Sequence, residues 1–248
     1  MDDQRFEAAC RSVIGVERER RGIGTLGEKT LHAVLKNYYQ PDRSKQEIKI
    51  GSFFADIAEE GRITEIQTGS FNALRKKLDQ MLISYKVTVV YPIAAVKYVC
   101  WIDPERGEVI SRKKSPKKGN IYESLKELYY IRDMLGDPNL TVRLLLLELD
   151  EYRLLDGWGK DRKNRATKYE KVPLRLISET DLSDKRDYMM LLPPSLPERF
   201  TAKELGKALR FSSIASYGAI KTFLATGCII PDGKVDRAAA YRIADGMN

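Results

Sequence analysis

The chain has 248 residues with a formal net charge of +8, and hydrophobic residues make up 43% of it. This length suits one large domain, or a medium-sized domain with a small appendage, and the basic balance favours a polyanionic partner, nucleic acid before an anionic membrane. The chain contains a single histidine, His32, which excludes Ser-His-Asp triads and histidine-rich zinc sites. Because His32 lies in the apolar pattern of an expected helix, we assign it a packing or surface role.

The cysteines and the apolar runs indicate a cytoplasmic protein without membrane association. Cys10, Cys100 and Cys228 lie far apart in the sequence, and a sparse, odd number of cysteines is typical of reduced thiols in the cytosol. The charged stretch MDDQRFEAAC lacks the pattern of a signal peptide, and the apolar runs are too short to span a bilayer.

Helical and strand-like segments alternate along most of the chain. Helices are expected at 3–20, 25–39 (with Thr25 and Glu28 as a capping box), 71–83 and 124–135. Strands are expected at 47–58, 62–68, 86–99, 140–155 and 172–177, with a hairpin around 100–110 and basic loops at 112–118 and 160–171. This order predicts an α/β fold, a mixed central sheet flanked by helices.

The composition changes near residue 193, where a proline-rich linker, 193–199, is expected. Beyond it, Thr201 and Glu204 form a second capping box, and Phe200 with Leu205 forms a hydrophobic staple. Two helices, at about 201–209 and 213–225, precede a hairpin whose tip is expected at 230–234 and whose return strand is expected at 235–243. Helix, turn, helix and hairpin in this order resemble the winged helix-turn-helix module.

Three polar side chains stand out in an apolar setting. Asp56 lies in one expected strand, a turn follows at 59–61, and Glu65 and Gln67 lie two residues apart in the next strand. Strand alternation puts Glu65 and Gln67 on one face, and Asp56 can lie beside them across the hairpin. Two converging carboxylates suit a hard divalent cation, whereas two solvated surface acids are the alternative.

The spacing of these residues on a hairpin followed by a helix resembles the PD-(D/E)XK nuclease superfamily, the restriction-endonuclease-like fold. Asp56 matches the first acid of the family pattern, Glu65 the second, and Glu28 the acid on the upstream helix. Gln67 stands where the family usually has lysine, and Ala55 stands where it often has proline. Glutamine brings no charge, so a cation from the next helix, Lys76 or Lys77, is expected to substitute.

The resemblance implies a restriction-endonuclease-like domain at 1–192 and a winged-helix domain at 200–248. It also implies a DNA endonuclease of restriction or repair type that depends on Mg²⁺ or Mn²⁺, with Asp56, Glu65, Gln67 and Glu28 as catalytic residues. The metal ligands would be Asp56, Glu65 and the backbone carbonyl of Ile66. Many members of the superfamily cut as dimers, so a homodimer is one expectation.

Basic and polar residues outside this motif are expected to bind DNA, mainly through its phosphates. The expected contacts are Lys76, Lys77, Lys113, Lys114, Lys117, Lys118, Arg162, Lys163 and Arg165, with Ser212, Ser213, Ser216, Tyr217, Lys221, Lys234 and Arg237 in the C-terminal module. Two alternatives stay open: a non-catalytic DNA-binding protein on a nuclease-like scaffold, and a protein-interaction domain.

Overall fold

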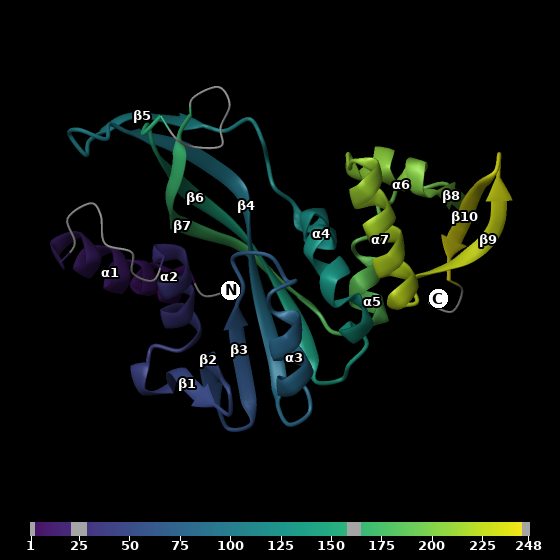
Figure 1. Cartoon of the computed structure of the whole chain (residues 1–248), viewed down its shortest axis with the longest axis horizontal. Helices are drawn as coiled ribbons and strands as arrows, with labels where there is room; N and C mark the ends of the chain where they lie inside the picture. Colours follow the sequence, from purple (N-terminus) through teal and green to yellow (C-terminus); the bar gives the residue numbers. More distant parts are fainter. Residues whose placement is uncertain (1–2, 21–28, 158–164, 245–248) are drawn as a thin grey trace. The chain divides into compact units, whose positions relative to one another are not determined.

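The structure, a computed structural model, describes residues 3–20, 29–157 and 165–244, with the side chains of the first helix described as far as residue 14 (Figure 1). Its chain divides into two compact units. Unit 1 comprises Met1–Ala58, Pro92–Asn120 and Leu145–Glu179, and unit 2 comprises Glu59–Tyr91, Ile121–Leu144 and Thr180–Asn248. Each unit therefore draws on three separate stretches, whereas the sequence suggested a linear division near the proline-rich segment.

Within the described part of the chain, the main sheet is mixed and has seven strands in the order β1-β2-β3-β4-β6-β7, with β5 paired to β4. The strands are β1 (Gln46–Ile50), β2 (Phe53–Glu59), β3 (Arg62–Ile66), β4 (Lys86–Ile102), β5 (Val109–Lys114), β6 (Leu140–Leu154) and β7 (Thr167–Leu182). Strand β3 runs parallel to β4, whereas β1 with β2 and β4 with β5 are antiparallel pairs. The expected α/β class, a mixed sheet flanked by helices, is confirmed.

Unit 1 begins with two helices that pack on each other, α1 (Asp3–Arg20) and α2 (Thr30–Tyr39). The rings of Phe6 and Tyr38 meet edge to face with centroids 5.4 Å apart, and the helical spacing of Leu31, Val34 and Leu35 puts all three in the core. A short turn, η1 (Arg43–Lys45), leads into β1. The expected cap at Thr25 and Glu28 lies outside the described residues.

Both expected basic loops are partly strand. Residues 109–114 form β5, and the described part of the second segment from residue 167 onward belongs to β7. Every residue of β5 is exposed or half-exposed, so the segment carries none of the apolar alternation from which a strand is recognised. Backbone pairing with β4 makes it a strand all the same.

In unit 2, helix α3 (Arg75–Met81) connects the parallel strands β3 and β4 and buries Leu78 and Met81. The helix expected at 124–135 is instead three short turns, η2 (Ile121–Ser124), α4 (Leu125–Leu128) and η3 (Tyr129–Met134). Ile131 has a non-helical backbone (φ −118°), and it is fully buried together with Leu125 and Leu128. This segment therefore buries its apolar side chains without forming one regular helix.

The C-terminal part of unit 2 contains α5 (Lys185–Met189), β8 (Arg199–Thr201), α6 (Ala202–Leu209), α7 (Ser213–Ala225), β9 (Ile229–Val235) and β10 (Ala238–Ile243). Its three strands form a second sheet in the order β8-β10-β9. The capping box of Thr201 and Glu204 is confirmed, and Phe200 and Leu205 are both fully buried. Helices α6 and α7 come close at Gly206, where a Cβ atom would lie 2.1 Å from the Ser216 hydroxyl.

The tip of the C-terminal hairpin lies at Asp236 and Arg237 and not at 230–234 as expected from the sequence. Both residues have positive φ angles, 47° and 75°, as a two-residue turn requires. Pro231 and Gly233 looked like turn residues, yet both lie within β9.

Candidate functional site

Glu65 is a buried carboxylate in the short strand β3. The residue is 4% exposed, and the neighbouring Ile63 and Ile66 are also buried. Its Oε2 atom accepts a hydrogen bond from Nζ of Lys77 at 2.6 Å. An ammonium group beside a buried carboxylate compensates for part of its lost hydration.

Helix α3 therefore supplies a cation beside Glu65, and it is Lys77 that does so. The expectation named Lys76 and Lys77 as equal candidates, and Lys76 is exposed on the same helix. The side chain of Lys77 is 24% exposed, so water and small ligands still reach its ammonium group.

Gln67 follows β3 and helps to fix the loop that leads to α3. Its backbone N–H donates to the carbonyl of Val90 at 2.9 Å, and its side-chain Nε2 donates to the carbonyl of Ser70 at 2.7 Å. Further along the loop, the N–H of Phe71 donates to Glu127 at 3.0 Å. The Gln67 amide nitrogen thus has a structural task in holding this loop.

Tyr91 packs beside this loop, with its ring 5.1 Å from that of Phe71. Burial, together with the carboxylates of Glu127 and Glu123, raises the pKa of Tyr91 to about 12. The phenol therefore stays protonated at neutral pH and acts as a hydrogen-bond donor and not as a base.

In unit 1, Asp56 lies on β2 and is in contact with the single histidine. Nε2 of His32, on α2, is 3.2 Å from Oδ2 of Asp56, and the two side chains are 21% and 15% exposed. Besides the packing or surface role expected from the sequence, His32 has a polar partner, Asp56, that the sequence did not predict. It lies at the border of the apolar stripe of α2, next to the buried Leu31, so it reaches a polar partner at the edge of the core. A polar residue at the edge of a helical stripe was the signal available in the sequence.

The candidate ligands thus occur as a carboxylate–imidazole pair in unit 1 and a carboxylate–ammonium pair in unit 2. Ile66, the third expected ligand, is 3% exposed. Glu28, the fourth expected catalytic residue, lies outside the described residues. Within 3–20, 29–157 and 165–244, no three His, Cys, Asp or Glu side chains are grouped so that they could hold a metal ion.

Most of the expected DNA contacts are on the surface of their own unit. Exposed side chains are those of Lys113, Lys114, Lys117, Lys118 and Arg165 in unit 1, and of Lys76, Ser212, Ser213, Tyr217, Lys221, Lys234 and Arg237 in unit 2. Ser216 does not belong with them, because it is 3% exposed and its hydroxyl donates to the Ser212 carbonyl at 2.8 Å. Arg162 and Lys163 lie outside the described residues.

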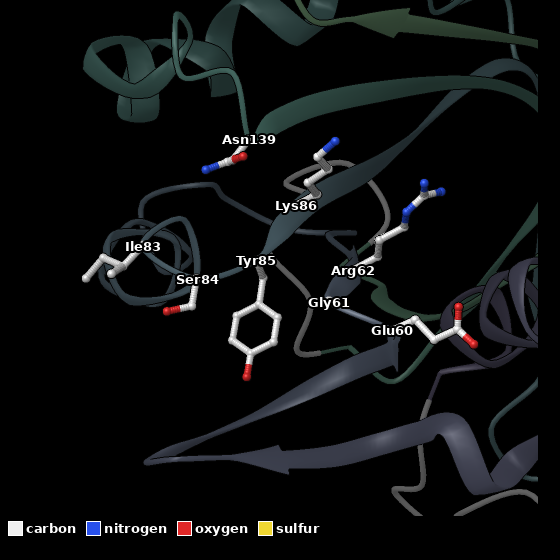
Figure 2. A pocket seen from close by; sticks show the side chains of 8 residues that line it. All are labelled: Glu60, Gly61, Arg62, Ile83, Ser84, Tyr85, Lys86 and Asn139. Atoms are coloured by element: carbon white, nitrogen blue, oxygen red, sulfur yellow. The ribbon is translucent and has the colours of Figure 1, made fainter.

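A pocket of about 460 Å³ lies elsewhere in unit 2, at the turn before β3 and the start of β4 (Figure 2). The side chains of Arg62, Tyr85 and Lys86 point in different directions there, so they do not converge on one ligand. This is the amino end of β3, whereas Glu65 is next to its carboxyl end. In open α/β sheets, ligands bind at the carboxyl ends of the parallel strands.

The chain is an α/β protein in which each unit has a partly buried pair of a carboxylate on a strand and a basic side chain on a helix. Residues 29–183 match a family described as "Domain of unknown function (DUF8091)", and the chain belongs to this family. The match includes both acid–base pairs and ends before β8.

An uncharacterized protein of Treponema pallidum (strain Nichols) is 26% identical over 221 residues, which cover 89% of this chain and 87% of that protein. No solved structure matches the chain. Among the described helices, none is both long enough and apolar enough to cross a membrane.

Proposed function

We propose that the chain is a metal-dependent DNA endonuclease with a restriction-endonuclease-like core. The observation that carries the proposal is the buried Glu65 with Lys77 beside it, because Lys77 brings from the next helix the cation that Gln67 lacks at the family's lysine position. The order α2, β1, β2, β3, α3, β4, with β3 parallel to β4, agrees with the helix, three strands, helix and strand of that core.

The donor set suits Mg²⁺ or Mn²⁺, since both prefer oxygen ligands and Mg²⁺ keeps several of its own waters. Asp56 and Glu65 would hold the ion, with the Ile66 carbonyl as the third ligand. When bound, such an ion supplies Lewis acidity and a bound water that loses its proton near neutral pH.

Three side chains of the protein would assist the reaction. The Lys77 ammonium would offset negative charge on the scissile phosphate, which is the task of the family's lysine. The free oxygen of the Gln67 amide would accept a hydrogen bond from the attacking water. His32 would orient the Asp56 carboxylate, or bind the ion itself through its ring nitrogen.

The C-terminal elements of unit 2 support binding of duplex DNA by a winged helix. The order β8, α6, α7, β9, β10 with the sheet β8-β10-β9 agrees with that module. One flank of α7 packs against η3, where Gly218 lies against Tyr129, so a different face is available to DNA. That face contains the exposed Ser213, Tyr217 and Lys221.

A non-catalytic DNA-binding protein is the second candidate. Both carboxylates already have basic partners, His32 and Lys77, and the Gln67 amide is engaged by Ser70. A site of this kind can persist as a structural polar network without turnover.

Incubation of supercoiled plasmid with the full chain and Mg²⁺ or Mn²⁺ distinguishes the two. The endonuclease nicks or linearises the plasmid, EDTA stops it, and Asp56→Ala and Glu65→Ala each abolish it. Glu60→Ala is the matched control, because this substitution removes the same charge from an exposed carboxylate outside the site. If every variant binds DNA and the wild type cuts with neither metal, the non-catalytic function replaces the nuclease.

A further inference from the structure

A second pocket of unit 2, about 410 Å³ in volume, lies at the turn between helices α6 and α7 (Figure 1). Its lining includes three exposed cations, Lys203 and Lys207 on α6 and Arg210 directly after this helix. Their spacing of four and three residues puts them in one row along the helix. On the side of α7, the lining residues are Ser213 and Ser216.

A fourth cation comes to this pocket from α4. Phe211 is one of the lining residues, and Nζ of Lys126 lies over its ring, 4.8 Å from the centroid. Ser213 is the first residue of α7, so the backbone N–H groups at the start of that helix add partial positive charge on the same side. The pocket is therefore positive on several sides.

Acidic side chains do not balance this charge. None of the lining residues is acidic, and among the described residues no carboxylate forms an ion pair with Lys207, Arg210 or Lys126. Glu204, next to Lys203 in the sequence, is directed to the start of α6, where it accepts hydrogen bonds from the N–H and the hydroxyl of Thr201 at 2.7 and 2.9 Å.

The backbone of Arg210 is a further observation at this pocket. Its φ angle is 56°, in the left-handed region, at the position that closes α6. Helices commonly end on glycine in this conformation, because a side chain there is disfavoured. An arginine at this position brings a guanidinium group to the pocket at the expense of backbone strain, and strain of this kind is concentrated at functional sites.

The exposed face of α7 differs from this row. Its only cation is Lys221, which lies 5.3 Å from the ring of Tyr217, and the neighbouring Ile214 is 87% exposed. Apolar and hydroxyl groups suit base edges, whereas phosphates are bound mainly by lysine and arginine. The residues for contact with phosphate therefore lie on α6 and not on α7.

A phosphate group fits the pocket, because it has the opposite charge and several acceptor oxygens for lysine and arginine. Like charges in one helical row repel each other, and a bound anion relieves this repulsion. Ser213 belongs both to the pocket and to the exposed face of α7. A phosphate bound here is therefore next to the surface expected to face the bases, as is a phosphate of a DNA strand.

We propose that this pocket binds a backbone phosphate of DNA through Lys207 and Arg210, with Lys203 and Lys126 as neighbouring contacts. In this arrangement α6, together with α4, supplies the phosphate contacts of the C-terminal module, and α7 supplies contacts to the bases. The inference rests on the proposed function only in taking DNA as the ligand, and it requires no cleavage.

Fluorescence anisotropy with a labelled duplex in EDTA measures binding without cutting. Lys207→Gln should reduce the slope of log affinity against log salt by about 0.9, the value of one lost phosphate contact, which corresponds to about eightfold weaker binding at about 0.1 M salt. The loss should be equal for two duplexes of unrelated sequence, because a phosphate contact carries no sequence information. Lys86→Gln is the matched control, since Lys86 is an exposed lysine of the same unit that lines the other pocket.

Arg210→Gly separates a binding role from a structural one. Glycine relieves the left-handed backbone, so this variant should melt at a higher temperature than the wild type while it binds DNA more weakly. Arg210→Lys keeps the charge and should retain most of the affinity. A lower melting temperature together with weaker binding in Arg210→Gly would show that Arg210 acts in folding and would overturn its role as a ligand.

Two more results would overturn the inference. In the first, Lys207→Gln binds the duplex with the affinity and salt slope of Lys86→Gln. In the second, calorimetry shows that the wild type binds the mononucleotide AMP and that Lys207→Gln does not, while both bind the duplex equally, so that a free phosphate compound is the ligand.

Failure of the pocket is distinct from failure of the nuclease. Weaker binding by Lys207→Gln, with no plasmid cleavage by the wild type, supports the pocket and rejects the nuclease. Plasmid cleavage by the wild type, with unchanged binding in Lys207→Gln and Arg210→Gly, supports the nuclease and rejects the pocket.

Discussion

Replacement of Lys77 by methionine removes the cation beside Glu65 and keeps most of the side-chain volume. At the observed 2.6 Å, the attraction between the two charges is about 6 kcal/mol for an effective dielectric constant near 20. Desolvation of both groups offsets part of this, and breaking a buried pair by loss of one partner typically costs 3–5 kcal/mol. Because water reaches the quarter-exposed Lys77, we expect Lys77→Met to lower the free energy of unfolding by about 3 kcal/mol.

Urea unfolding followed by circular dichroism measures this change, and helix α3 offers a matched control. Arg75 also pairs with a carboxylate, but Asp133 is 53% exposed, so Arg75→Met should lower the free energy of unfolding much less than Lys77→Met. The double variant Glu65→Gln/Lys77→Met should have a free energy of unfolding about 2 kcal/mol higher than that of Lys77→Met. The reason is that Lys77→Met leaves a buried carboxylate without the ammonium group, whereas the double variant has a neutral amide there. If Lys77→Met and Arg75→Met lower the free energy of unfolding by the same amount, the burial of Glu65 does not strengthen its ion pair with Lys77.

Three further outcomes are expected. Thr201→Ala should destabilise the chain by about 1 kcal/mol through loss of the α6 cap, while Thr201→Ser should not; thermal unfolding compares the two. Burial would raise the pKa of Glu151, but the hydrogen bond from Arg153 and the charge of Lys97 overcome it and hold this pKa below its ordinary value. The stabilisation by Glu151 is therefore present above the unfolded pKa of about 4.3 and is lost as the pH falls. Between about pH 5 and pH 3, the free energy of unfolding should fall more steeply in the wild type than in Glu151→Gln. Burial and the nearby Glu7 raise the pKa of Cys10 to about 11, so at pH 8 its thiol should react with a disulfide reagent much more slowly in the folded chain than in urea; equal rates would contradict the burial.

Local patterns in the sequence sufficed for much of the fold. Alternation located β3, which carries Glu65, and the Thr201 capping box located the start of α6, because both signals depend only on residues that are neighbours in the chain. The single strand expected at 47–58 is instead two strands, β1 and β2, with Asp56 on the second. The proline-rich segment leads into β8, a short strand that the sequence did not predict.

Contacts between distant segments could not be read from the sequence. His32 and Asp56 are 24 residues apart and meet only because α2 packs beside β2. The choice of Lys77 over Lys76 depends on a rotation of about 100° around a helix whose start the sequence leaves uncertain. Strand β5 escaped recognition because it is exposed on both faces.

The interleaving of the two units has a consequence for synthesis on the ribosome. Unit 2 needs residues 59–91, 121–144 and 180–248, so its first two stretches leave the ribosome well before its third stretch has been made. Contacts between such distant segments form only after a long loop has closed, which costs entropy, and they slow folding. At an elongation rate of about 5–20 residues per second, this wait lasts on the order of ten seconds, during which apolar side chains such as Leu125 and Leu128 lack the α7 surface that packs against their helix.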